Sequence, residues 1–256
     1  MHNRSTHLSG SRGFTLIEML IVVAILGIIL GGIMVQLGNV VQRAGAEQVK
    51  VDDFQEARDF VDQFFRDINQ IGYPNIRMVD ASSPAFVPAI NPAYPAIMND
   101  NRFSIGLVKI DANELMFEGN TDGDGVPESI HYMLDGSGTC ALCMQRSQVD
   151  KVVGGPLPAP AGAQGSNWGT EVNDVISNPT FAYFKTDGTQ VLGLPVDVTT
   201  GAATLANIKT IQIKLTIQNP NVRDPKTKQP IQTTFEGEVS LNNCSMAASG
   251  QAMSCQ

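Results

Sequence analysis

The sequence predicts an α+β protein in which a long N-terminal helix packs on a mostly antiparallel β domain. All 14 prolines lie at or after Pro74, so nothing in the preceding chain forces a break in a helix. An apolar stretch in this proline-free region leads into a second stretch with apolar residues every three or four positions. Beyond residue 101 the pattern changes to short, alternating segments separated by turn residues, which indicates strands.

The composition narrows the classes of protein that the chain can belong to. It has 256 residues, of which 43% are hydrophobic and 16% charged, and this balance excludes both a disordered tail and a multi-span membrane protein. The net charge of −8 argues against nucleic acid as a partner of the bulk domain. After residue 7 only His131 remains for histidine chemistry, and no catalytic motif is present. We therefore expect no enzyme and no resident cofactor other than a possible metal ion.

The first part of the helix has the length of a membrane span. Residues 19–37 contain a single strongly polar side chain, Gln36, and would extend about 28 Å as a helix, close to the thickness of a bilayer core. The preceding segment, residues 1–13, carries Arg4 and Arg12 and no acid. Positive charge before an apolar span keeps that end cytoplasmic. The C-terminal domain should therefore cross the membrane.

The second part of the helix is amphipathic. Its apolar positions recur at helical spacing and form one stripe that should face a core. Charged residues, Asp67 among them, lie between these apolar positions. Gly72, Tyr73 and Pro74 supply a stop, because glycine suits the left-handed cap and proline cannot continue the helix. A single helix over residues 14–71 is the prediction. The members of the stripe are Phe54, Ala57, Val61, Phe64, Ile68 and Ile71.

The remainder, residues 72–256, is predicted to be β-rich. A loop should occupy 74–101, an irregular segment 154–169, and a long polar hairpin connection 219–230. The last two strands show the clearest alternation, with apolar residues on one face. The predicted strands are Ser104–Ile110, Glu114–Phe117, Ser129–Leu134, Cys143–Val149, Thr180–Lys185, Ile208–Gln218 and Thr233–Leu241.

The most specific signal lies where the basic leader meets the apolar span. The run Gly13-Phe14-Thr15-Leu16-Ile17-Glu18 places one carboxylate, Glu18, near the start of an otherwise apolar helix. A charge in such a position is costly, so it usually has a partner or a role. Two simpler interpretations of this segment remain. The first is an uncleaved membrane anchor whose acidic residue near the interface has no role, and the second is a secretory signal peptide cleaved at residues 44–46. The second fits poorly, because the apolar run is too long for a signal peptide and Arg43 intervenes.

Residues 12–20 resemble the class III signal of type IV pilins and type II secretion pseudopilins. The resemblance implies a pilin-like fold, cleavage by prepilin peptidase after Gly13 and N-methylation of the new terminal residue, Phe14. It also implies that Glu18 pairs with the amino terminus of a neighbouring subunit. This role is physically reasonable, because an unpaired carboxylate and an unpaired amine in hydrocarbon cost more than the two together.

Residues 60–73 are similar to the helix end of minor pilins of the PilW/PulJ type. Looser similarity to that group follows in 181–188, 208–218 and 233–243. The resemblance implies a minor pilin that initiates or caps a filament, with prepilin peptidase and other major and minor pilins as partners. It implies a single-pass inner-membrane location with a periplasmic head before assembly. Alternatives are a J-type secretion pseudopilin and, in another class, a single-span membrane-anchored binding protein or enzyme.

An acidic, glycine-containing segment at 120–128 resembles the first half of a calcium-binding loop. Asn120, Asp122, Asp124 and Glu128 offer oxygen ligands, and Gly125 suits a sharp bend. The twelfth position, where a bidentate acid is expected, holds His131. The alternative is a plain Asp-Gly hairpin turn between two strands, and this is the preferred interpretation.

All four cysteines lie beyond the predicted span, in a compartment that permits disulfides. Three pairings are possible, and the predicted one is Cys244 with Cys255 and Cys140 with Cys143. The Cys140-Ala-Leu-Cys143 run could be a redox motif, but no βαβ pattern surrounds it. Zinc bound by four cysteines agrees with the cysteine count but fits such a compartment poorly.

Overall fold

The computed structural model describes residues 15–74, 101–102, 104–136, 142–151, 167–224, 226–241, 245–246 and 253–254. The chain divides into two compact units, Met1–Gln48 and Val49–Gln256, and each is treated by itself. The second half of the long helix therefore belongs to the same unit as the strands. The predicted leader, residues 1–13, and most of the loop predicted at 74–101 lie outside the described residues.

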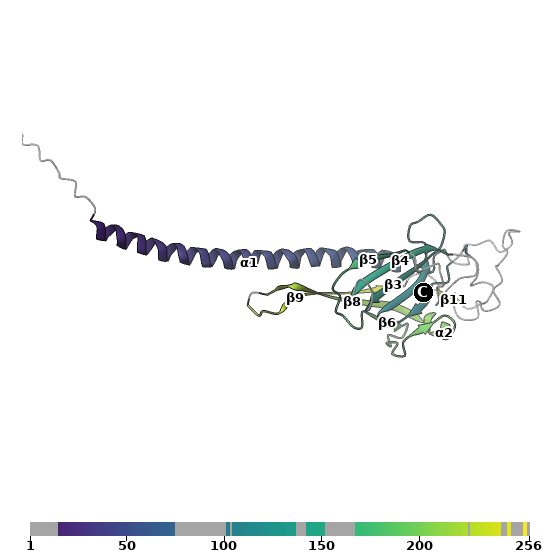
Figure 1. Ribbon diagram of the computed structural model, residues 1–256. Helices are drawn as coiled ribbons and strands as arrows, with labels where there is room; N and C mark the ends of the chain where they lie inside the picture. Colours follow the sequence, from purple (N-terminus) through teal and green to yellow (C-terminus); the bar gives the residue numbers. More distant parts are fainter. Residues whose placement is uncertain are drawn as a thin grey trace, which may run out of the picture. The chain divides into compact units, whose positions relative to one another are not determined.

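The helix α1 runs from Leu16 to Ile68 over 53 residues and confirms the predicted long N-terminal helix (Figure 1). Its predicted end at Ile71 was wrong. Ile71 instead forms an antiparallel bridge with Gly119, and Gly72 N donates a hydrogen bond to Glu118 O at 3.0 Å. Gly72 has a φ of 77°, the left-handed conformation predicted for it. The helix ends early because the backbone after it pairs with a strand.

The strands form antiparallel sheets, as the sequence predicted. The strand order in the largest sheet is β5 (Trp168–Val172), β4 (Cys143–Asp150), β3 (Glu128–Asp135), β2 (Glu114–Gly119), β1 (Leu107–Ile110) and β7 (Val196–Asp197). The order in a second sheet is β6 (Phe181–Lys185), β8 (Ile208–Arg223) and β9 (Pro230–Ser240). A two-stranded pair, β10 (Ser245–Met246) with β11 (Met253–Ser254), and a short helix, α2 (Ala202–Leu205), complete the described elements.

Two strand predictions need correction. No strand was predicted at 168–172, yet β5 pairs there with the edge of β4. Its Gly169 and Glu171 weaken the strand pattern, so pairing with an existing edge decides its conformation. The polar connection predicted at 219–230 is also shorter than expected. Strands β8 and β9 continue to Arg223 and Pro230, because backbone pairing carries on through polar residues.

The core of the second unit lies between the C-terminal half of α1 and the strands. Five of the six residues in the predicted stripe are buried, and Phe64 and Ile68 are 0% and 1% exposed. The ring of Phe64 stacks on Phe181 with centroids 5.7 Å apart and meets the edge of Tyr132 at 5.4 Å. The sixth residue, Phe54, is half-exposed, and the centroid of its ring lies 4.9 Å from that of Phe235. The 3.6-residue period therefore identified the packed face of the helix correctly.

A buried carboxylate in α1, that of Asp67, joins the helix to the largest sheet. Asp67 is 1% exposed. Its Oδ2 accepts hydrogen bonds from Tyr132 Oη at 2.6 Å and Arg146 Nε at 2.7 Å, and Gln63 Nε2 donates to its Oδ1 at 2.6 Å. Asp67 lies three residues after Phe64, so its spacing already placed it on the core face. Its charge is matched by Arg146, which the sequence could not reveal.

Candidate functional site

The first turn of α1 contains a reciprocal cap. Thr15 precedes the first helical residue, and its backbone N donates a hydrogen bond to Glu18 Oε2 at 2.9 Å. Thr15 Oγ1 donates to the same oxygen at 2.8 Å, and Glu18 N lies 3.4 Å from Thr15 Oγ1. This is a capping box, which satisfies backbone donors that have no partner inside the helix. The Thr-x-x-Glu pattern of residues 15–18 is its sequence signal, but the cap was not among the predictions.

The cap fixes the position of the Glu18 carboxylate. Glu18 is exposed, and its side chain folds back toward the N-terminal end of α1. A carboxylate at this end is favoured by the positive end of the helix dipole. Gly13 and Phe14, the predicted processing residues, lie outside the described residues. The cap thus ties the Glu18 carboxylate to Thr15, the second residue after the predicted cleavage point.

The apolar side chains after Glu18 are exposed all around the helix. Most large hydrophobic residues from Leu16 to Val41 are more than half exposed. The helix is long and apolar enough to cross a membrane, and none of its most apolar stretch is buried. An exposed apolar surface of this extent is stable in lipid or against other helices and not in water.

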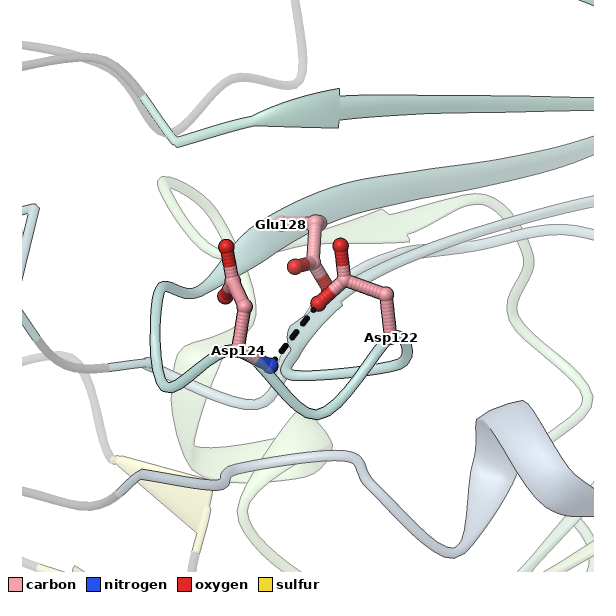
Figure 2. A group of neighbouring side chains, drawn as sticks. All are labelled: Asp122, Asp124 and Glu128. Carbon is pink, nitrogen blue, oxygen red and sulfur yellow. Dashed lines mark hydrogen bonds between the residues drawn. The ribbon is translucent and has the colours of Figure 1, made fainter.

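The predicted Asp-Gly loop joins β2 to β3 and contains a cluster of carboxylates. Oxygens of Asp122, Asp124 and Glu128 all lie within 4.8 Å of one another, and Figure 2 shows the three side chains side by side. Asp122 and Asp124 are exposed, whereas Glu128 is 1% exposed. Asn120, the fourth predicted ligand, accepts a hydrogen bond from Gly123 N at 2.8 Å through its Oδ1. The hairpin turn is confirmed, and it also brings the acids together.

The electrostatics differ between the two glutamates that begin β2 and β3. Burial raises the pKa of Glu128 to about 7 despite hydrogen bonds from Thr121, and the Asp122 carboxylate adds to the rise. Burial also opposes ionisation of Glu114, but His131 and Lys109 outweigh it and lower its pKa to about 2. His131 Nε2 lies 2.8 Å from Glu114 Oε1. The centroid of the His131 ring lies 4.7 Å from that of the Trp168 ring. His131 is a polar side chain within a strand, as predicted.

The cysteines are only partly described. Cys143, the first residue of β4, is disulfide-bonded. Cys140, Cys244 and Cys255 lie outside the described residues, so the pairings Cys140–Cys143 and Cys244–Cys255 stay predictions.

Comparison with known proteins supports the N-terminal assignment. Residues 8–34 match a family model described as the prokaryotic N-terminal methylation motif. The match includes Gly13, Phe14 and Glu18, and it continues into the apolar part of α1. No curated protein and no solved structure matched the chain. The motif and the exposed apolar helix together support a type IV pilin-like or pseudopilin-like protein and fit membrane anchoring.

Proposed function

We propose that this chain is a structural subunit of a type IV pilus or pilus-like filament, and specifically a minor pilin that initiates or caps assembly. In this proposal prepilin peptidase cleaves after Gly13 and methylates the amine of Phe14. The chain then spans the inner membrane once, with its head in the periplasm, until it joins other pilins. The role is structural and not catalytic. The observation that carries the proposal is the match of residues 8–34 to the methylation motif.

The capping box supports a specific role for Glu18. Cleavage after Gly13 leaves Thr15 in place, so the cap persists in the mature chain. One carboxylate oxygen of Glu18 accepts both hydrogen bonds from Thr15. The second oxygen has no hydrogen bond within the part of the chain that the structure describes, and it can accept the amine of a neighbouring Phe14. In hydrocarbon this pairing removes two costly isolated charges.

The exposed apolar half of α1 supplies the assembly surface. Its side chains are apolar on all sides, so the helix can pack among several others at once. The head does not use these residues in its own core. Assembly therefore exchanges lipid contacts for helix contacts without disturbing the fold of the head.

The minor-pilin assignment rests on residues 60–73, which resemble the PilW/PulJ type. The J-type secretion pseudopilin shares this resemblance and is the alternative within the same class. Affinity purification of the assembled filament under native expression separates them. Association with a surface pilus supports the minor pilin, and association with secretion components supports the pseudopilin.

Mass spectrometry of the mature N-terminus tests the proposal directly. We expect the chain to begin with N-methylated Phe14. An intact Met1 in cells that contain prepilin peptidase would refute the proposal and favour an uncleaved membrane-anchored protein.

A matched pair of variants tests the role of Glu18. Glu18→Ala should be cleaved and inserted normally yet fail to enter filaments, because the neighbouring amine then lacks its partner. Glu47→Ala removes an exposed acid further along α1 and should assemble like the wild type. Immunoblots of sheared filaments measure incorporation. Normal incorporation of Glu18→Ala would contradict the assigned role.

A further inference from the structure

The loop between β2 and β3 is built around two glycines in the left-handed region. Gly119 and Glu128 are opposite each other in the ladder and close the loop. Gly123 and Gly125 have φ values of 82° and 90°, a backbone conformation that residues other than glycine rarely adopt. These turns fold residues 120–127 back on themselves. The fold-back brings acids from both ends of the loop to one place.

One oxygen of each aspartate is used to shape the loop. Asp122 Oδ1 accepts a hydrogen bond from Asp124 N at 3.1 Å, drawn as the dashed line in Figure 2. Asp124 Oδ1 accepts one from Val126 N at 2.7 Å. These bonds fix the two carboxylates and leave the second oxygen of each without a hydrogen bond inside the described part of the chain. The loop thus orients acceptors that it does not itself satisfy.

Glu128 provides a buried acceptor with no partner. Its Oε2 accepts hydrogen bonds from Thr121 N at 2.6 Å and Thr121 Oγ1 at 3.1 Å. Its Oε1 is buried and has no hydrogen-bond partner, although the residue is only 1% exposed. A buried oxygen without a hydrogen-bond partner destabilises the fold, and a charged one does so more strongly. Figure 2 shows this carboxylate turned toward the two aspartates.

Among the described residues, no cation forms an ion pair with any of these three acids. The buried cation Lys151 binds a different carboxylate, Glu118 Oε2, at 2.8 Å. Three carboxylates within 4.8 Å of one another repel unless a positive charge lies between them. Burial of one of them makes the repulsion stronger. A small, highly charged cation held between the three carboxylates would relieve this repulsion.

We propose that Asp122, Asp124 and Glu128 bind a calcium ion in the β2–β3 loop. Two oxygens that each lie about 2.4 Å from one calcium ion are at most about 4.8 Å apart, which the cluster satisfies. The ligands are all hard oxygens, which suit calcium and not zinc. Calcium takes six to eight oxygens in flexible geometry, so loop carbonyls and water fill the remaining positions. This inference is independent of the proposed filament role.

The position of the loop gives the ion a structural consequence. Gly119, at the start of the loop, forms the bridge with Ile71, and Glu118 O accepts the hydrogen bond from Gly72 N. The ion would therefore stabilise the hairpin against which the end of α1 is held. Calcium binding should raise the stability of the whole second unit.

Thermal unfolding of the full chain in a mild detergent tests the proposal. Trp168, the single tryptophan, lies in β5 and reports on the head. After removal of divalent ions with a chelator, about 10 mM calcium chloride should raise Tm by about 3–10 °C, given the affinity of extracellular calcium sites. The same concentration of magnesium chloride should have a much smaller effect. Calorimetric titration should give a single calcium ion per chain.

Asp122→Asn is the test variant, because Asp122 is exposed and its loss should not prevent folding. It should retain less than half of the calcium-dependent rise in Tm. Asp187→Asn is the matched control, since Asp187 precedes Gly188 in another turn and accepts hydrogen bonds from Thr189 at 2.8 and 2.6 Å. It should keep the full rise. No rise in the wild-type chain, an undiminished rise in Asp122→Asn, or an equal effect of magnesium would each overturn the proposal.

Discussion

The two halves of α1 have the same secondary structure but use apolar residues differently. In residues 16–41 the large apolar side chains surround the helix and are exposed. From Ala57 to Ile68 they form a stripe that is almost fully buried, with Phe64 and Ile68 at 0% and 1% exposure. Helix formation therefore does not distinguish the halves. The distribution of apolar residues around the helix does.

This difference assigns separate tasks to one continuous helix. The second half contributes to the core of the head, so changes there should alter the stability of the fold. The first half keeps its apolar surface for lipid or other helices, so changes there should alter insertion or assembly and leave the head intact. The head should therefore respond to substitutions in only one of the two halves.

The largest effect should come from truncating a core side chain in the second half. Phe64→Ala removes a ring packed between Phe181 and Tyr132 and should lower the free energy of unfolding by about 4 kcal/mol. Ile29→Ala, in the exposed half, should change it by less than about 0.5 kcal/mol. Urea unfolding in detergent, followed by Trp168 fluorescence, measures both. If both variants lowered the free energy of unfolding equally, the two halves of α1 would not have separate tasks.

Removal of the buried carboxylate should have the next largest effect. Asp67→Ala leaves Arg146 and the buried Tyr132 hydroxyl without their acceptor and should cost about 3 kcal/mol. The control is Asp62→Ala, which breaks an exposed pair with Arg58 and should cost less than about 1 kcal/mol. A double-mutant cycle with Arg146→Ala should show strong coupling to Asp67. Additive effects would mean that Asp67 does not anchor the helix through Arg146.

The junction after the helix should tolerate little added volume. A Cβ at Gly119 would lie 2.5 Å from Gln70 O, a backbone atom that cannot move without disturbing the end of α1. Gly119→Ala should therefore destabilise the head by about 1–3 kcal/mol. Gly193→Ala meets nothing within 4 Å and serves as the control, with an expected change below about 0.5 kcal/mol. If Gly119→Ala left the stability of the head unchanged, the backbone at this junction would have room for a methyl group.

The smallest effect should be a pH dependence confined to the head. The pKa of Glu114 is lowered from 4.5 to about 2 by His131 and Lys109, so its stabilising contribution is present above pH 4.5 and is lost as the pH falls through about 2. Glu114→Gln should reduce stability at pH 7 by about 1–2 kcal/mol after solvent screening. The difference from the wild type should disappear near pH 2. Unfolding curves at a series of pH values measure it, and a constant difference would refute the assignment.

Local patterns in the sequence were enough to predict much of the fold. Proline placement and the 3.6-residue period predicted a long helix and its buried stripe, and alternation predicted strands close to β1–β4, β6, β8 and β9. Strand β5 was missed because Gly169 and Glu171 give it little strand character of its own. It forms because β4 offers an unpaired edge.

The same distinction between local sequence patterns and long-range contacts applies to the candidate sites. The segment around Gly13, Phe14 and Glu18 is contiguous, so the motif that contains it could be recognised from the sequence alone. The partner of Asp67 could not be found in this way, because Arg146 lies 79 residues further along the chain.

By itself, then, the sequence determined the N-terminal signal, the apolar span and the order of helix and strands. These properties depend on neighbours within a few residues. The tertiary structure decided that Asp67 is buried, that the helix ends at Ile68, and that Glu128 lies unpartnered beside Asp122 and Asp124. Burial and charge pairing depend on which distant segments meet in space, and only the folded chain brings those segments together.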